Sequence, residues 1–350
     1  MSKDEKILVL NIATDAKDTS LGFAISWLNV FSDNYSEVDV ITLNKGDTSN
    51  LSENINIYEV VNKTKVGRFI SFIKILNKLT KNKKYSFCLS HMSAILILIS
   101  FPILKLRKIR SVLWYTHQGP KNLFKKLILF KALLLSSNVI TASKFSFPYK
   151  NKKVDQIGHA IDYKTFYKKI ESFSKKDFAI VSRVSKSKNI EESIKGFLKS
   201  NASESSSILI IGGPLTNEDK DYYEYLLNKY KDNKNVSFIG PVPHSELVSY
   251  LKNVSFHINN TDKGFYDKSV LETSVNGIIN FYKNVDYDKN IPIEYPEVLK
   301  FDGSSNDLSN KISSVFRLNE NEILKIIEHS QEEINNESLD TLVKRIESVI

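Results

Sequence analysis

The sequence predicts an α/β protein with two doubly wound domains, because short apolar runs alternate with amphipathic segments along most of its 350 residues. Residues 6–12, KILVLNI, form a continuous apolar run of the kind found in a strand that is buried on both faces. A second apolar run with the character of a buried strand, FAIV at residues 178–181, follows a polar tract at residues 168–176 and begins the second domain. A chain of this length is sufficient for two domains with separate cores, and we expect them to face each other across a cleft.

The first half continues this alternation. Runs with strand character are found at residues 38–43, 55–60, 87–92, 111–119 and 139–142. Amphipathic segments with a helical period occupy residues 23–31, 66–82 and 123–137. The apolar run at residues 94–104 is too short to cross a bilayer and contains Pro102.

The second half repeats the pattern. Strands are expected at residues 207–211, 236–239, 254–259 and 278–282. Helices are expected at residues 219–231, 244–252, 269–276, 305–316, 320–331 and 338–350. The domain boundaries that follow are a first domain at residues 1–160, a linker at 161–176, a second domain at 177–335 and a C-terminal helix at 336–350.

The composition is that of a globular protein, with 41% apolar and 25% charged residues. The single cysteine, Cys88, excludes an internal disulfide and a cysteine-based zinc site, and it favours a reducing compartment. The first residues, MSKDEK, lack the apolar stretch of a signal peptide. We therefore expect a cytoplasmic protein that is either soluble or bound peripherally to the inner face of the cell membrane.

Charge is distributed unevenly along the chain. Residues 1–160 contain 24 Lys and Arg against 11 Asp and Glu, whereas residues 161–350 contain 25 against 29. No acidic residue occurs at positions 61–153, which carry 20 Lys and Arg interleaved with aromatic residues and leucine. Such a span suits an anionic membrane surface, a phosphorylated lipid carrier or nucleic acid, or it forms a solvated basic face. Of these partners we expect a membrane surface and no nucleic acid.

Two cations follow the strand at residues 178–181. Arg183 and Lys188 lie between that strand and the next predicted helix. Placed there, they can neutralise the charge that develops on a nucleotide leaving group. These two residues are therefore candidates for binding a diphosphate.

A helix that begins after the strand at residues 254–259 gives a second phosphate signal. Either Asp267 or Ser269 can cap it, and Ser269 and Glu272 have the spacing of a capping box. Backbone N–H groups and the positive dipole end of such a helix suit a phosphate. Glu272, about one turn inside, is placed to accept two vicinal hydroxyl groups such as those of a ribose.

The segment DKSVLETSVNG at residues 267–277 resembles the nucleotide-sugar segment of glycosyltransferase family 4, whose members have the GT-B fold with two Rossmann-like domains. The resemblance covers nearly the whole chain and is strongest at residues 178–281. It implies that Glu272 binds the donor ribose and that residues 240–242 contact the nucleobase through backbone atoms. The donor-binding residues that it implies are Gly22, Arg183, Lys188, Gly240, Asp267, Lys268, Ser269, Val270 and Glu272.

The first domain extends the resemblance. Residues 11–28, NIATDAKDTSLGFAISWL, are similar to the acceptor-side opening of these enzymes, in which a glycine, here Gly22, lies near the donor phosphates. Asp15 and Asp18 in this loop are either polar contacts or, more simply, loop and cap residues. The strand with LWYTH at residues 113–117 resembles enzymes that build bacterial surface polysaccharides, and the resemblance implies that His117 faces the transferred sugar. His91 ends an earlier strand and is the less favoured of the two histidines.

The resemblance also implies the reaction. It indicates transfer from a nucleotide-diphosphate sugar to a glycan or lipid-linked acceptor in cell-surface polysaccharide synthesis, with retention at the anomeric carbon and without a metal or other cofactor. By the same analogy, residues 159–166 form the inter-domain turn, and the last helix crosses back to the first domain.

One departure leaves alternatives open. The family's E-x7-E motif places its first Glu eight residues before Glu272, where this chain has Gly264, so the role of that Glu does not carry over to this chain. A GT-B sugar-nucleotide epimerase, a non-catalytic nucleotide-sugar-binding subunit and a nucleic-acid binder remain alternatives. The DYD triplet at residues 286–288 resembles the metal motif of single-Rossmann glycosyltransferases, but in this two-domain pattern it indicates coincidence. The motifs HExxH, GxSxG and GxxxxGK[ST] do not occur, which argues against zinc proteases, α/β-hydrolases and P-loop proteins.

Overall fold

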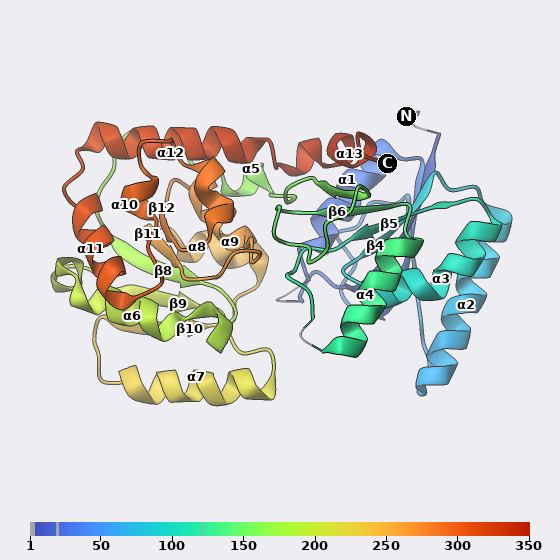
Figure 1. The fold of residues 1–350 in the computed structure, drawn as a ribbon, viewed down its shortest axis with the longest axis horizontal. Coiled ribbons are helices and arrows are strands. Elements are labelled where there is room, and N and C mark those ends of the chain that lie inside the picture. The colour runs from blue at the N-terminus through green and yellow to red at the C-terminus, as the bar shows by residue number, and fades with distance from the viewer. Residues whose placement is uncertain (1–3, 19–20, 121) are drawn as a thin grey trace. The chain divides into compact units, whose positions relative to one another are not determined.

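The computed structural model describes residues 4–18, 21–120 and 122–350. The chain forms two compact units: unit 1 consists of residues 1–160 and 339–350, and unit 2 of residues 161–338 (Figure 1). Each unit contains one parallel sheet covered by helices, so the predicted α/β class with two Rossmann-like units is confirmed. Residues 161–176, expected as a linker, belong to unit 2, where the Asn276 side chain donates to the Phe166 carbonyl at 2.9 Å.

Unit 1 is built on a seven-stranded sheet with the order β3-β2-β1-β4-β5-β6-β7. Its strands are β1 (Lys6–Thr14), β2 (Glu37–Lys45), β3 (Ile55–Glu59), β4 (Phe87–His91), β5 (Arg110–Trp114), β6 (Asn138–Thr141) and β7 (Val154–Gln156). Its helices are α1 (Ala24–Asn34), α2 (Lys65–Asn82), α3 (Ala94–Leu106), α4 (Leu123–Leu135) and α13 (Leu339–Glu347).

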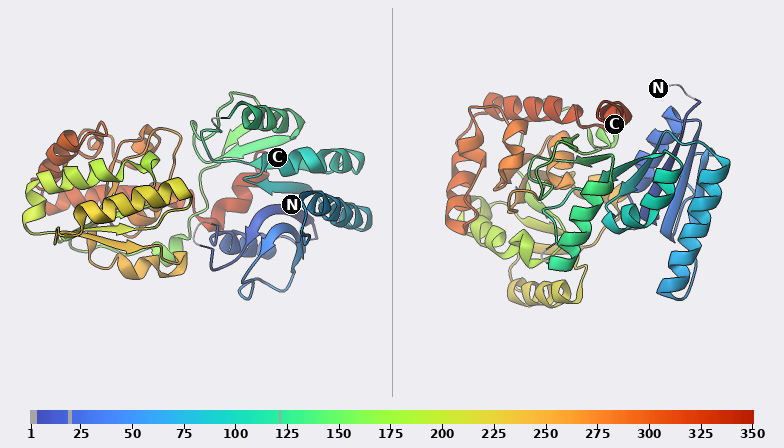
Figure 2. Two further views of the ribbon diagram at one scale, coloured as in Figure 1. Left: turned by 90° about the horizontal axis from the view of Figure 1, so that it is seen from below. Right: turned by 45° about the vertical axis from the view of Figure 1, so that its right-hand side comes forward.

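The central strand β1 is apolar without alternation because helices cover both faces of the sheet. Ile7 packs in a buried cluster with Trp27 of α1 and Leu342 of α13. Leu8, on the opposite face, packs in a second cluster with Leu76 of α2. Helices α1 and α13 therefore lie against one face, and α2 and α3 against the other (Figures 1 and 2).

Unit 2 has a five-stranded parallel sheet with the order β10-β9-β8-β11-β12. Its strands are β8 (Asp177–Val181), β9 (Ile208–Ile211), β10 (Val236–Gly240), β11 (Val254–Asn259) and β12 (Ile279–Tyr282). Its α-helices are α5 (Tyr163–Phe166), α6 (Ile190–Lys199), α7 (Asn217–Tyr230), α8 (Leu247–Tyr250), α9 (Lys268–Val275), α10 (Pro296–Leu299), α11 (Ser305–Val315) and α12 (Glu320–Asn335). Short 3-10 helices are η1 (Lys186–Lys188), η2 (Asn201–Glu204), η3 (His244–Glu246) and η4 (Val285–Asn290).

Three elements differ from the sequence-based expectations. The apolar run at residues 94–104 is helix α3 rather than an unassigned segment, because Leu96 and Leu104 fill the core between the sheet and α2. The strand expected at residues 111–119 ends at Trp114, so His117 lies in the following loop. The helix expected at residues 244–252 divides into η3 and α8.

The strand orders place a topological switch point in each unit. In unit 2 the chain moves outward from β8 to β9 and β10, and then returns to the other side of β8 with β11. In unit 1 the corresponding point lies between β1 and β4. Ligands of open parallel sheets bind outside the carboxyl ends of the strands at such points. None of the helices in the described part of the chain has the length and apolar character needed to cross a bilayer.

Candidate functional site

The candidate site lies in unit 2, at the carboxyl ends of the neighbouring strands β8 and β11. The loop after β8 carries Arg183 and Lys188, and the loop after β11 leads into α9. The Asn189 side chain donates to the Asn260 carbonyl at 3.0 Å and joins the two loops. Residues predicted from two distant parts of the sequence therefore meet at one edge of the sheet.

Lys188 is held by a carboxylate. Its Nζ lies 2.7 Å from both Oδ1 and Oδ2 of Asp267, and 5.3 Å from the centre of the Phe265 ring. The side chains of Lys188 and Asp267 are 10% and 22% exposed. Asn259, the last residue of β11, also donates to Asp267 Oδ2 at 3.0 Å. The predicted diphosphate-binding lysine thus points to the start of α9.

Arg183 is more open to solvent than Lys188. Its side chain is 42% exposed, and its Nε lies 3.9 Å from Asp219 Oδ2. Asp219 already accepts the backbone N–H of Thr216 at 3.0 Å in the capping box of α7. The long contact with Asp219 leaves the Arg183 guanidinium accessible after β8. An exposed ion pair of this kind contributes little to stability.

Two glycines bring the neighbouring loops of β9 and β10 close to the Arg183 loop. Gly212 has a φ of +135°, and a Cβ there would lie 1.9 Å from the Ser182 carbonyl oxygen. Its N–H donates to the carbonyl of Gly240 at 2.8 Å. Gly240 itself has a φ of +84°, a conformation that favours glycine. The predicted nucleobase contact Gly240 therefore lies two strands away from Arg183 at the same sheet edge.

The expected capping box at Ser269 is wrong. Helix α9 begins at Lys268 with Asp267 as the N-cap residue, and the Asp267 carboxylate makes no capping hydrogen bond because it is turned to Lys188. Ser269 lies inside the first turn, where its carbonyl accepts the Thr273 hydroxyl at 2.7 Å. Val270 is buried, and its N–H donates to the Asp267 carbonyl at 3.3 Å.

Glu272 is 4% exposed, and its Oε1 lies 2.8 Å from Nε2 of His244. Burial opposes charge on this imidazole, but the attraction of the Glu272 carboxylate outweighs it and raises the pKa of His244 above 6.5. His244 was missed as a site residue, since the sequence gives only its place after PVP and no sign of its distant partner. A buried carboxylate oriented by a histidine can present its remaining lone pairs to hydroxyl groups.

Two basic side chains near the carboxyl end of β11, Lys268 and His257, have lowered pKa values. Burial lowers the pKa of Lys268 to about 8, against the attraction of Glu272. Burial also lowers the pKa of His257 to about 4. The His257 Nε2 accepts the N–H of Val181 at 3.2 Å, and Nδ1 lies 2.6 Å from Asn280 Oδ1. A neutral His257 therefore fixes the end of β8, from which the Arg183 loop starts.

Gly264, which occupies the position of the family's first Glu, has a role in the structure of its loop. The Gly264 N–H donates to Asp286 Oδ2 at 2.8 Å, and Gly264 has a φ of +88°. Asp288 of the same DYD triplet pairs with Lys300 at 2.8 Å. Within residues 4–18, 21–120 and 122–350, no group of three His, Cys, Asp or Glu side chains is arranged to hold a metal ion.

The candidate residues of unit 1 occupy loops after β1 and β5. The Gly22 N–H donates to the Asp18 carbonyl at 2.9 Å, and Asp18 Oδ1 accepts the N–H of Leu21 at 2.7 Å. His117 is exposed, with its ring 6.1 Å from that of Tyr115. His91, by contrast, is 4% exposed, and its ring lies 5.3 Å from that of Trp114. Asp15 Oδ1 accepts the N–H of Asp47 at 2.9 Å, as expected for a loop residue.

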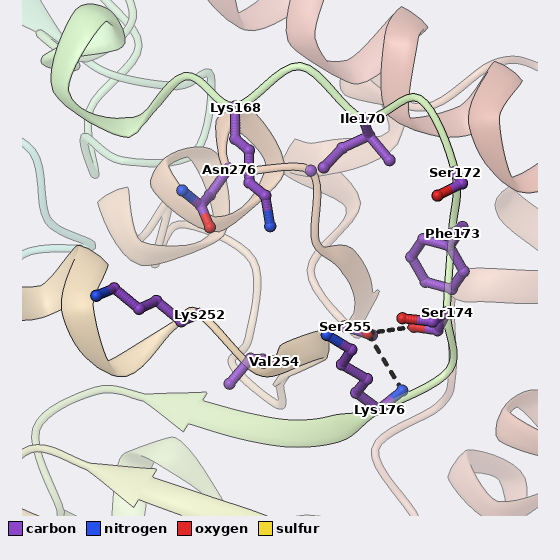
Figure 3. A pocket seen from close by; sticks show the side chains of 11 residues that line it. Lys168, Ile170, Ser172, Phe173, Ser174, Lys176, Lys252, Val254, Ser255 and Asn276 are labelled. Carbon is purple, nitrogen blue, oxygen red and sulfur yellow. Dashed lines mark hydrogen bonds between the residues drawn. The ribbon is translucent and has the colours of Figure 1, made fainter.

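A shallow pocket occurs at the opposite, amino-terminal edge of the unit 2 sheet (Figure 3). Its lining includes Lys168, Lys252 and Asn276, and the Ser255 hydroxyl donates to the Ser174 carbonyl at 2.7 Å. Because ligands of parallel sheets bind at the carboxyl edge, we place the candidate site at Lys188 and Glu272 instead.

One protein family matches part of unit 2. Residues 164–259 match the family model described as glycosyl transferases group 1. No curated protein sequence matches the chain significantly.

Solved structures resemble the chain over nearly its whole length. Anabaena Alr3699/HepE, crystallised with UDP and glucose or with UDP-glucose, has a TM-score of 0.76 at 13% identity and covers 99% of this chain and 100% of its own. A glycosyltransferase from Rickettsia africae ESF-5 has a TM-score of 0.73 at 13% identity, and the match covers 99% of this chain and 98% of the Rickettsia chain. The lipopolysaccharide outer core galactosyltransferase WaaB has a TM-score of 0.66 at 13% identity, and the match covers 99% of this chain and 100% of the WaaB chain. These likenesses show a GT-B fold, and within it residues 164–259 match the glycosyl transferases group 1 model.

Proposed function

We propose that this protein is a glycosyltransferase that moves a sugar from a nucleoside-diphosphate donor to a glycan or lipid-linked acceptor in cell-surface polysaccharide synthesis. The observation that carries the donor class is the meeting of Lys188, the start of α9 and Glu272 at the β8–β11 switch point. The binding of UDP-glucose by HepE supports the same class of donor.

Each residue of unit 2 has a separate task in this proposal. Arg183 and Lys188 neutralise the diphosphate as the bond to the sugar breaks, because both are cations at the strand end. The N–H groups at the start of α9 add a positive dipole end. Glu272, oriented by His244, accepts the two hydroxyl groups of the ribose, and the backbone around Gly240 contacts the base.

The family resemblance, rather than geometry, supports roles for two residues of unit 1. On that basis we propose that Gly22 approaches the donor phosphates and that His117 faces the transferred sugar. The same resemblance supports retention at the anomeric carbon and catalysis without a metal or other cofactor. Proton NMR of the product anomer tests retention, since inversion would give the opposite anomer.

We also propose a cytoplasmic location with peripheral binding to the anionic inner face of the cell membrane. The basic span at residues 61–153, of which position 121 lies outside the described residues, includes α4. One face of α4 packs in the core through Leu129 and Leu133. The other face carries a stripe of apolar side chains that are 43–72% exposed: Leu123, Leu127, Phe130 and Leu134. A helix that is apolar on both faces and basic between them suits a bilayer surface.

A thermal-shift screen tests the donor. Nucleoside diphosphates and their sugars should raise the unfolding midpoint of the wild-type protein by mass action, and Glu272→Ala should abolish that rise. Glu246→Ala is the matched control, because Glu246 is an exposed glutamate on the 3-10 helix that carries His244. A midpoint that rises equally in the wild type and in Glu272→Ala would contradict the proposed site.

Turnover separates the transferase from its alternatives. An epimerase would isomerise the donor sugar in the absence of any acceptor. A non-catalytic subunit would bind the donor without turnover across a panel of glycan and lipid-linked acceptors. The proposal requires an acceptor-dependent product and release of the nucleoside diphosphate.

A further inference from the structure

The side chain of Asp267 occupies the position on Lys188 that an anionic ligand would take. Its two oxygens each lie 2.7 Å from Nζ, so they take up N–H donors of the point charge that would attract a phosphate. The Phe265 ring lies 5.3 Å from the same nitrogen, and Lys188 is only 10% exposed. An arriving phosphate must therefore share this ammonium group with Asp267 or displace it.

Asp267 does not have the usual task of an N-cap residue. An aspartate at this position commonly accepts a backbone N–H from the first turn, which stabilises a helix by about 1 kcal/mol. Here the backbone of Asp267 has the extended conformation of an N-cap, with a φ of −75° and a ψ of 132°, but the side chain makes no capping bond. The carboxylate instead binds Lys188 and Asn259.

This arrangement brings a negative charge to the site proposed for a diphosphate. A carboxylate and a phosphate on one ammonium group repel each other, and the partly buried setting reduces screening by solvent. We propose that Asp267 is an internal competitor that weakens the binding of nucleoside diphosphates to Lys188 and so favours release of the nucleotide product. This inference rests on the proposed donor site.

The decisive variant is Asp267→Asn. It keeps the size of the side chain and an oxygen that can accept from Asn259, but it removes the negative charge. Isothermal titration calorimetry with UDP, GDP and ADP should show about tenfold tighter binding of the recognised diphosphate, as expected when a competing charge-assisted contact is removed. The gain should be smaller for the monophosphate of the same base and absent for the nucleoside.

Asp262→Asn is the matched control. Asp262 lies in the same loop and pairs with Lys283 at 2.7 Å, but its side chain is 60% exposed. The substitution makes the same change in net charge without touching Lys188, so we expect nucleotide affinity within about twofold of the wild type. Lys188→Met completes a double-mutant cycle, in which Asp267→Asn should bring no gain once the lysine is absent.

The outcomes separate the two claims. A diphosphate that binds the wild type and Asp267→Asn equally, or binds the variant more weakly, overturns the inference and leaves the donor site intact. If Asp267→Asn changes the affinities for diphosphate, monophosphate and nucleoside by a similar factor, the role of Asp267 is purely structural. That result would also overturn the inference. If no diphosphate binds either protein although both unfold cooperatively, the proposed donor site fails and the inference fails with it.

Discussion

Nε2 of His244 lies 2.8 Å from Oε1 of Glu272, although 28 positions separate the two residues in the chain. The carboxylate favours the protonated imidazole and raises the pKa of His244, so this contact stabilises the fold most below pH 6.5 and less as the pH rises through the raised pKa. We expect His244→Gln to lower the free energy of unfolding by about 1 kcal/mol near pH 6 and by less near pH 8.5. Urea unfolding at the two pH values measures this difference, and His329→Gln on α12 is the control. A loss that is independent of pH would contradict the assignment.

His257 gives a prediction for the acid side. Its folded-state pKa of about 4 lies below 6.5, so the folded protein binds fewer protons than the unfolded chain, and stability is lost as the pH falls between these values. We expect His257→Gln to cost about 2 kcal/mol near pH 7, because the Val181 N–H and Asn280 lose a well-placed partner. The variant should also lose less stability than the wild type between pH 6.5 and pH 4. Parallel acid sensitivity of both proteins would show that other groups dominate.

Lys268 gives a prediction for the alkaline side. Its pKa of about 8 means that holding the charge destabilises the fold at neutral pH, and that this penalty disappears as the pH rises from about 8 to 10.5. Near pH 7 the free energy of unfolding of Lys268→Met should therefore exceed that of the wild type by about 1 kcal/mol. This difference should disappear by about pH 10. Lys220→Met, an exposed lysine on α7, should show no such gap. Chemical denaturation between pH 7 and 10 tests it, and a less stable Lys268→Met at neutral pH would refute it.

The apolar stripe of α4 predicts binding to anionic bilayers. Replacing Leu123 and Leu127 by Glu should reduce cosedimentation with phosphatidylglycerol vesicles at least about tenfold, because it removes apolar surface and adds negative charge. Ile293→Glu is the control, since Ile293 is 91% exposed but lies in unit 2. Neutral phosphatidylcholine vesicles should retain little of either protein. Equal retention of the double variant and the wild type would place the bilayer contact elsewhere.

Much of the fold could be predicted because the strands are local signals. The run at residues 6–12 is apolar on both faces, and the structure places it in the centre of a sheet with helices on each side. Helix α3 could not be identified in the same way, because the run at residues 94–104 is apolar almost throughout and gives no helical period.

The site was predictable only in part. Arg183, Lys188 and Asp267 lie between a strand and the α-helix that follows it, where position alone suggests a ligand. The capping box at Ser269 failed because α9 begins at Lys268, which leaves Ser269 inside the first turn. The N-cap side chain of Asp267 points to Lys188, 79 positions away in the chain, which no local pattern reveals. His244 was missed for a similar reason: a pairing between distant loops leaves no periodic trace in the sequence.

The order of the elements has a consequence for synthesis on the ribosome. Leu342 and Ile346 of α13 are fully buried beside Trp27 of α1, yet all of residues 161–338 are translated before them. Unit 2 can therefore finish folding while the nascent unit 1 still exposes the apolar surface around Trp27. That surface is where we expect a chaperone to bind until translation reaches α13.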